Sequence, residues 1–237
     1  MRLDKLIADT QAGTRSEAKE HIKRGNVTIN GAVIKKPEYK VNEFEDKICL
    51  MGNEICFQQF FYYMLHKPSG VVTATKDDRE RTVMDLMGTA AGKNLFPVGR
   101  LDKDTEGLLL VTNDGALSHR LLSPKKHVEK TYYVECAGTI TPEDILKLEQ
   151  GVDIGDDKLT LPAKVNHVKQ SDAAYSLELS ITEGRFHQIK RMIHAVGSEV
   201  TYLKRIAFGG LVLDHMLAVG EWRLLRQEEI EQLKGGF

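Results

Sequence analysis

The chain has 237 residues, of which 41% are hydrophobic and 28% charged, a composition typical of a soluble globular protein with one large domain or with a small and a medium one. It contains no apolar run near the roughly 20 residues that a membrane-spanning helix needs, and acidic residues stand where a signal peptide would be apolar. Its three cysteines have the spacing of neither a zinc site nor a disulfide framework. We therefore expect a cytoplasmic protein with reduced thiols and no membrane association.

The formal net charge is −1, but positive charge is concentrated in two segments. Residues 1–40 contain nine lysines and arginines against five acidic residues, and residues 185–205 contain five against one. Affinity for nucleic acids comes largely from neutralising phosphates. The two basic segments therefore favour a protein that contacts a phosphate backbone at chosen places, although such charges can also merely solvate exposed helix faces.

The first 25 residues predict two short helices. Residues 3–10 place apolar side chains on one helical face. Residues 15–24 form the second helix, because Thr14 and Glu17 have the spacing of a capping box and Gly25 is typical of the position just after a helix.

A hairpin is expected next. Asn30-Gly31 is a strong signal for a tight turn, and it lies between strands expected at residues 27–29 and 33–34. One more strand is expected at residues 47–50. Residues 52–60 then form the expected joint to the rest of the chain.

Short strands predominate after the joint. The expected strands are residues 61–65, 71–74, 95–98, 108–112, 131–136, 164–168, 175–182, 199–208 and 222–225. The expected helices are residues 114–122, 142–150, 185–196 and 227–234. Strands that mostly follow one another, without βαβ alternation or a Gly-rich phosphate loop, indicate an α+β domain built on a long, largely antiparallel sheet.

Residues 99–115 (G-R-L-D-K-D-T-E-G-L-L-L-V-T-N-D-G) carry the most informative pattern of the chain. A loop with a charged cluster leads directly into an apolar strand, and catalytic residues are concentrated on loops that rigid elements anchor. Asp102 is therefore the first candidate for a reacting group. The alternative is that Asp102 only caps a turn or pairs with Arg100 or Lys103, because Asp is a common turn residue.

Three further segments accompany this one: L-H-K-P-S-G at residues 65–70, E-K-T-Y-Y-V at 129–134 and E-G-R-F-H-Q-I-K-R-M-I-H at 183–194. The four segments in this order resemble the pseudouridine synthases, specifically the branch that acts on ribosomal RNA, and most closely its members for the small subunit. The N-terminal helices and hairpin resemble the S4 RNA-binding domain that this branch carries. The S4-like skeleton consists of Arg15, Ala18, Ile22, Gly25, Val27, Asn30 and Gly31.

The resemblance implies two domains: an S4-like RNA-binding domain at residues 1–58 and a pseudouridine synthase catalytic domain at residues 59–237. The catalytic domain is expected to hold a long, largely antiparallel mixed sheet flanked by helices, with the active-site cleft across its middle. The implied function is isomerisation of a specific uridine in 16S ribosomal RNA. The same chemistry on a 23S site and a non-catalytic ribosome assembly factor remain as alternatives.

The family reaction breaks the bond between ribose C1′ and uracil N1, turns the base and rejoins it through C5. No atoms enter or leave, so the resemblance implies no cofactor. The expected partner is ribosomal RNA or a small-subunit assembly intermediate, bound by a monomer. His187 and His194 are seven residues apart, but no third ligand accompanies them, and we expect no metal site.

The resemblance implies three catalytic residues. Asp102 is the nucleophile, with attack on the ring or on the sugar left open. Tyr132 stacks on the uracil, and its hydroxyl can receive the C5 proton. Lys190 supplies the cation that offsets the cost of burying the Asp102 carboxylate. Sister branches carry Arg at this position, and Lys gives a less rigid pairing.

Lys190 lies on a helix whose core face is expected to hold Phe186, Ile189, Ile193 and Val196. Arg191 competes with Lys190 for its role or holds a phosphate. Lys67, Pro68 and Gly70 are expected to support the catalytic loop, and Asp114 is expected to cap a helix. The expected substrate-binding residues are Arg100, Lys130, Arg191, Arg2, Lys5, Arg15 and Lys19.

Overall fold

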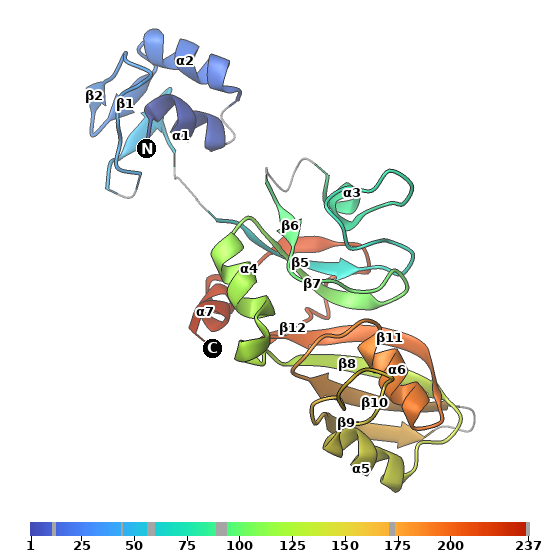
Figure 1. The fold of residues 1–237 in the computed structure, drawn as a ribbon. Coiled ribbons are helices and arrows are strands. Elements are labelled where there is room, and N and C mark those ends of the chain that lie inside the picture. The colour runs from blue at the N-terminus through green and yellow to red at the C-terminus, as the bar shows by residue number, and fades with distance from the viewer. Residues whose placement is uncertain (11–12, 44, 56–59, 89–93, 171–173, 236–237) are drawn as a thin grey trace. The chain divides into compact units, whose positions relative to one another are not determined.

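The computed structural model describes residues 1–10, 13–43, 45–55, 60–88, 94–170 and 174–235. The chain divides into two compact units, Met1–Phe60 and Phe61–Phe237 (Figure 1). The boundary expected between residues 58 and 59 lies outside the described residues. Within the described ranges, no helix is both long and apolar enough to cross a membrane.

The first unit packs two helices against a small antiparallel sheet. Its elements are α1 (Leu3–Asp9), α2 (Arg15–Lys23), β1 (Val27–Ile29), β2 (Ala32–Val33), β3 (Ile48–Leu50) and β4 (Asn53–Glu54), with the strands in the order β2-β1-β3-β4. The predicted capping box is confirmed, because the Thr14 hydroxyl accepts the Glu17 N–H and the Glu17 carboxylate accepts the Thr14 N–H. The predicted hairpin is also confirmed, with Asn30 and Gly31 at φ 51° and 86° between β1 and β2.

The second unit is built on one large mixed sheet, so the predicted α+β fold is confirmed. Its main path has the strand order β13-β5-β7-β11-β8-β10-β9, with β6 beside β7 and β12 beside β11. The strands are β5 (Tyr62–Lys67), β6 (Phe96–Pro97), β7 (Glu106–Thr112), β8 (Lys130–Ala137), β9 (Lys164–Gln170), β10 (Ala174–Ile181), β11 (Glu199–Phe208), β12 (Leu211–Val212) and β13 (Trp222–Leu224). Strands β7 and β11 run parallel, whereas the other pairings are antiparallel.

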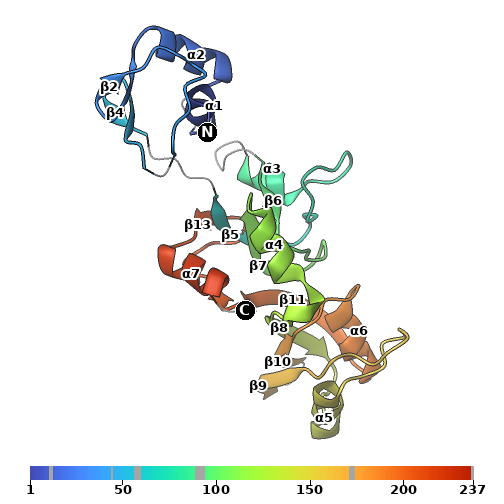
Figure 2. The same cartoon turned by 60° about the vertical axis from the view of Figure 1, so that its left-hand side comes forward.

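Helices surround this sheet. They are α3 (Val83–Met87), α4 (Gly115–Leu122), α5 (Pro142–Gln150), α6 (Gln188–Ala195) and α7 (Gln227–Gly235). Figures 1 and 2 show α6 against β11 and α5 beside β9. The predicted cap of α4 is confirmed, because Asp114 Oδ1 accepts the Leu117 N–H at 2.9 Å.

Two expectations for this unit are wrong. Residues 71–74 form no strand: Val72 makes an isolated bridge to Thr82, which caps the unpredicted short helix α3. Helix α6 begins at Gln188 and not at residue 185, because His187 has a left-handed backbone (φ 48°). Phe186 therefore falls out of helical phase and is 73% exposed, whereas the three other residues predicted for the core face of the helix are buried.

Candidate active site

Lys67 anchors the loop between β6 and β7 that carries Asp102. Its side chain is fully buried, and Nζ donates hydrogen bonds to the carbonyls of Pro68 (3.0 Å), Lys103 (3.2 Å) and Thr105 (2.8 Å). Burial lowers the pKa of Lys67 to about 8, against the opposing effect of nearby carboxylates. The prediction that Lys67 supports the loop that carries Asp102 is thus confirmed; a catalytic role of this loop stays a prediction.

Further contacts hold the same loop from the segment after β5. The Thr73 hydroxyl donates to the Leu101 carbonyl at 2.8 Å, and the Gly70 N–H donates to the Lys103 carbonyl at 2.8 Å. The Lys103 ammonium pairs with Glu80 at 2.8 Å. The backbone on both sides of Asp102 is therefore fixed by hydrogen bonds, which holds its carboxylate in a defined position.

A row of residues across three strands forms the floor beside this loop. Gly107 of β7 pairs with Arg205 of β11, which pairs with Tyr132 of β8. A Cβ atom at Gly107 would lie 2.2 Å from the Arg205 carbonyl oxygen, so only glycine allows the two strands to approach here. Directly opposed residues share a face of the sheet, which places the side chains of Arg205 and Tyr132 side by side.

A cavity of about 620 Å³ lies over this floor. The structure brings five of the predicted site residues together around it: Arg100, Asp102, Lys130, Tyr132 and Lys190. The Tyr132 side chain is 8% exposed, so its ring forms part of a wall and not of the outer surface. A nucleoside-sized ligand fits a cavity of this size.

Two basic side chains from one segment flank the Asp102 carboxylate, which is 31% exposed. His187 Nε2 lies 3.6 Å from Oδ1, and Lys190 Nζ lies 3.9 Å from Oδ2. The closer partner of Lys190 is Asp104, at 2.6 and 2.7 Å, and this hydrogen bond lowers the pKa of Asp104. The sequence interpretation considered His187 only as a metal ligand and missed its position beside Asp102, which depends on the left-handed backbone at His187.

Two cations that share one aromatic ring form a second charged cluster of the cavity. Lys130 Nζ lies 5.8 Å and Arg205 Cζ 5.0 Å from the centre of the Phe208 ring. Burial and the nearby guanidinium lower the pKa of Lys130 to about 8. Arg205 is 2% exposed, and its Nη2 atom is buried without a hydrogen-bond acceptor among the described residues. Arg205 was not predicted as a site residue, since only the pairing of β11 with β8 brings it to Tyr132.

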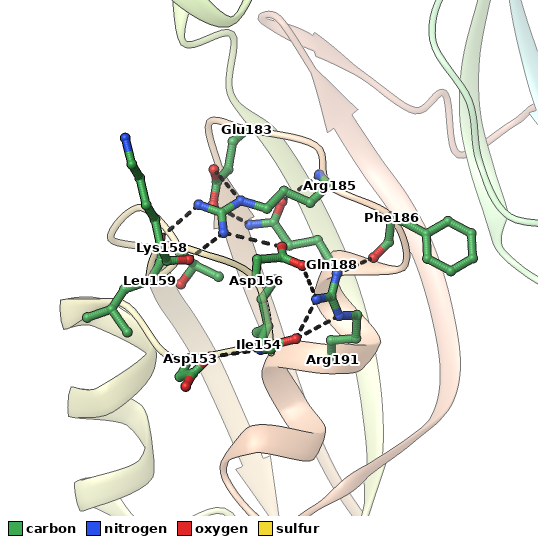
Figure 3. Close-up of polar contacts among 12 residues, drawn as sticks. Asp153, Ile154, Asp156, Lys158, Leu159, Glu183, Arg185, Phe186, Gln188 and Arg191 are labelled. Carbon is green, nitrogen blue, oxygen red and sulfur yellow. Dashed lines mark hydrogen bonds and ion pairs between the residues drawn. The ribbon is translucent and has the colours of Figure 1, made fainter.

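Arg191 lies in a different set of contacts, shown in Figure 3. Its guanidinium pairs with Asp156 and donates hydrogen bonds to the carbonyls of Ile154 (2.9 Å) and Phe186 (3.1 Å). The neighbouring Arg185 pairs with Glu183 at 3.0 Å and with Asp156 at 3.4 Å. These contacts fasten the loop before β9 to the segment that carries His187 and Lys190. Substrate binding by Arg191 stays a prediction.

The basic residues predicted in the first unit are organised around a buried acid. The Asp4 carboxylate is fully buried and pairs with Arg2 at 3.0 Å and with Arg15 at 3.3 Å, and both arginines are about half exposed. Burial alone would raise the pKa of Asp4, but the hydrogen bonds from the two guanidinium groups hold it below its ordinary value. Lys5 and Lys19 are exposed.

Comparison with known proteins agrees with this architecture. Residues 61–195 match the RNA pseudouridylate synthase family, and residues 1–48 match the S4 domain. The chain therefore belongs to the RNA pseudouridylate synthase family, in a form that carries an N-terminal S4 domain, and it is an RNA pseudouridine synthase.

Two relatives are similar along almost their whole length. A Bacillus subtilis protein named uncharacterized RNA pseudouridine synthase YtzG is 47% identical over 98% of each chain. The ribosomal small subunit pseudouridine synthase A of Vibrio cholerae is 39% identical over 98% of this chain and 99% of its own. A crystal structure of a pseudouridylate synthase superposes with a TM-score of 0.69 at 38% identity, and it covers 98% of this chain and 99% of its own.

Proposed function

We propose that this protein isomerises a specific uridine to pseudouridine in 16S ribosomal RNA, with Asp102 as the nucleophile. The observation that supports the chemistry most directly is the meeting of Asp102 and Tyr132 in one cavity of about 620 Å³. The small-subunit target is inferred from the relatives named ribosomal small subunit pseudouridine synthase A.

In this proposal the uridine is turned out of the RNA and its uracil stacks on Tyr132. Asp102, held in place by the contacts of its loop, then reacts at the nucleotide. The His187 imidazole and the Lys190 ammonium lie beside this carboxylate, with Nε2 3.6 Å from Oδ1 and Nζ 3.9 Å from Oδ2. The C1′–N1 bond breaks with its electron pair on the uracil, which turns and rejoins the ribose through C5. The C5 proton then leaves, with the Tyr132 hydroxyl as its expected first acceptor, N1 gains a proton, and the Asp102 carboxylate is released.

In this scheme Lys130 and Arg205 stabilise the uracil after its bond to the ribose has broken. A base that leaves with the bonding pair carries negative charge spread over its ring nitrogen and carbonyl oxygens. The buried Arg205 and the partly buried Lys130 stabilise such charge. The buried Nη2 atom of Arg205 is a donor that a uracil carbonyl can satisfy.

RNA outside the cavity is expected to contact the basic residues of the first unit. Arg2, Lys5, Arg15 and Lys19 would neutralise phosphates, and Arg100 would fill the gap that the turned-out uridine leaves or bind a phosphate. The expected partner is ribosomal RNA or a small-subunit assembly intermediate, bound by a monomer.

The test uses ribosomal RNA from cells that lack the protein. It is incubated with the native protein, with Asp102→Asn and with Asp157→Asn, a control at an exposed carboxylate outside the cavity lining. Pseudouridine has the mass of uridine, so it is detected as a carbodiimide adduct that stops primer extension. We expect one new stop in 16S RNA with the native protein and the control, and none with Asp102→Asn.

Other outcomes correct the proposal in defined ways. A new stop in 23S RNA would move the target to the large subunit. Unchanged turnover by Asp102→Asn would exclude Asp102 as the nucleophile. Tight binding without a stop on naked RNA or on assembly intermediates, together with normal ribosome maturation in cells that carry only Asp102→Asn, would favour a non-catalytic assembly factor.

A further inference from the structure

Phe186 is a large aromatic residue at the cavity, with no part in the chemistry described above. It lines the cavity together with Asp102 and His187, yet 73% of its surface is exposed. An exposed apolar side chain is by itself ordinary on a protein surface. What distinguishes Phe186 is how firmly the structure holds it beside the reacting group.

The backbone that carries the ring is fixed by the ion-pair network of Figure 3. Arg191 donates a 3.1 Å hydrogen bond to the Phe186 carbonyl, and the preceding Arg185 donates 2.7 Å hydrogen bonds to the carbonyls of Lys158 and Leu159. In Figure 3 the Phe186 ring points away from this network. A ring on a fixed backbone loses little conformational freedom when a flat ligand stacks on it.

One face of the ring is covered by His187. The two ring centres are 3.9 Å apart and the planes are inclined by 18°, so the rings stack. His187 Nε2 in turn lies 3.6 Å from Asp102 Oδ1. The stack therefore places the Phe186 ring next to the reacting carboxylate, while its high exposure leaves its other face accessible.

A uridine that turns into the cavity leaves its neighbours in the RNA without a stacking partner. The base next to the target must then lie near the cavity mouth, because one nucleotide step links it to the uridine inside. Aromatic side chains are a common platform for unstacked RNA bases. We propose that Phe186, backed by His187, forms a stacking shelf for the base adjacent to the target uridine. This inference rests on the proposed function.

The chain offers variants that separate aromatic stacking from simple apolar contact. Phe186→Leu keeps an apolar side chain but removes the ring, and Phe186→Trp keeps an aromatic ring. Met216→Ala is the matched control, because Met216 is 78% exposed and does not line the cavity. Because Phe186 is exposed, we expect its variants to fold as the native protein does, and thermal unfolding of each variant checks this.

The first measurement compares binding of UMP, ApU and UpA to the full chain by NMR titration. We expect one of the two dinucleotides to bind native protein between about 5- and 150-fold more tightly than UMP, the range for stacking of one base. Phe186→Leu should lose this advantage and keep the affinity for UMP. Phe186→Trp and Met216→Ala should retain both.

The second measurement is the KM and kcat of isomerisation on 16S RNA, where Phe186→Leu should raise KM by about tenfold with little change in kcat. The shelf would be overturned if Phe186→Leu still bound the dinucleotide more tightly than UMP. It would also be overturned if Phe186→Leu lost affinity for UMP and for the dinucleotide by the same factor. Pseudouridine formation with an unchanged KM in Phe186→Leu would also overturn it while the proposed function stands. If the native protein neither bound UMP nor formed pseudouridine, both the proposed function and the proposed stacking shelf would be wrong.

Discussion

Two clusters of charged side chains with different partners line the cavity. Asp102 lies with His187 and Lys190, whereas Lys130 and Arg205 share the ring of Phe208. Burying cations costs free energy unless negative charge arrives to meet them. The departing uracil carries such charge only after its bond to ribose breaks, so the second cluster should act on the rate more than on binding.

Loss of the Lys130 proton should therefore slow the reaction. The pKa of Lys130 is lowered to about 8, so its side chain is a cation below that pH and becomes neutral above it. We expect kcat/KM, which reports the free enzyme, to fall as the pH rises through about 8. Lys130→Met should be slower at pH 7 and lack this alkaline limb, as rate profiles between pH 6 and 9.5 will show.

Three other charged groups bear on this assignment. Arg205 lowers the pKa of Lys130 and Glu183 raises it, and both residues are unchanged in Lys130→Met. Lys67 also has a pKa of about 8, but it faces the carbonyls of the catalytic loop. An alkaline limb that survives in Lys130→Met would assign the titration to Lys67 or to another group.

Asp104 provides a test of which carboxylate reacts. It lies two residues after Asp102 and binds Lys190 more closely, but its side chain is 67% exposed. An exposed ion pair contributes up to about 1 kcal/mol. We expect Asp104→Asn to lower the single-turnover rate by less than about fivefold, because Lys190 can then shift toward Asp102. Complete loss of turnover in Asp104→Asn would instead make Asp104 the nucleophile.

Elements of this chain were predictable where their signals are local. The capping box of Thr14 and Glu17, the Asn30-Gly31 turn and the Asp114 cap each depend on residues within four positions of one another. The start of α6 was not predictable in this way. It depends on the left-handed backbone of His187 and on contacts between this segment and the loop before β9.

The contact between β7 and β11 depends on the absence of a side chain at Gly107. Alanine there would add strain at φ 104° and place Cβ 2.2 Å from the Arg205 carbonyl oxygen. We expect Gly107→Ala to lower the free energy of unfolding of the second unit by about 3 kcal/mol and its Tm by roughly 6 to 12 °C. Chemical and thermal denaturation measure both values.

Gly138 is the matched control for this substitution. It has a similar positive φ of 82°, but a Cβ atom there would meet nothing within 4 Å. Gly138→Ala should therefore cost only the backbone strain, about 1 kcal/mol. Equal losses at the two positions would mean that the close approach of β7 and β11 contributes nothing.

At the scale of the whole molecule, the sequence predicted the α+β architecture, the S4 domain and the class of enzyme, because the motifs that carry them are contiguous. Arg205 was missed for the opposite reason. It lies more than 70 residues after Tyr132 in the chain, and only the register of β11 against β8 makes the two neighbours. Residues that come together from different strands can be assigned to one site only when the pairing of those strands is known.

The two units should contribute separately to RNA affinity and to chemistry. Arg15 is half exposed over the buried Asp4, and Arg24 lies at the other end of α2 in an exposed pair with Glu20. If Arg15 binds a phosphate, Arg15→Gln should raise KM, leave kcat unchanged and reduce the slope of log affinity against log salt concentration by about 1. Arg24→Gln is the charge-matched control and should change the slope less. Equal slopes for native protein and Arg15→Gln would show that Asp4 has already neutralised this arginine and that other residues of the S4 domain bind the RNA.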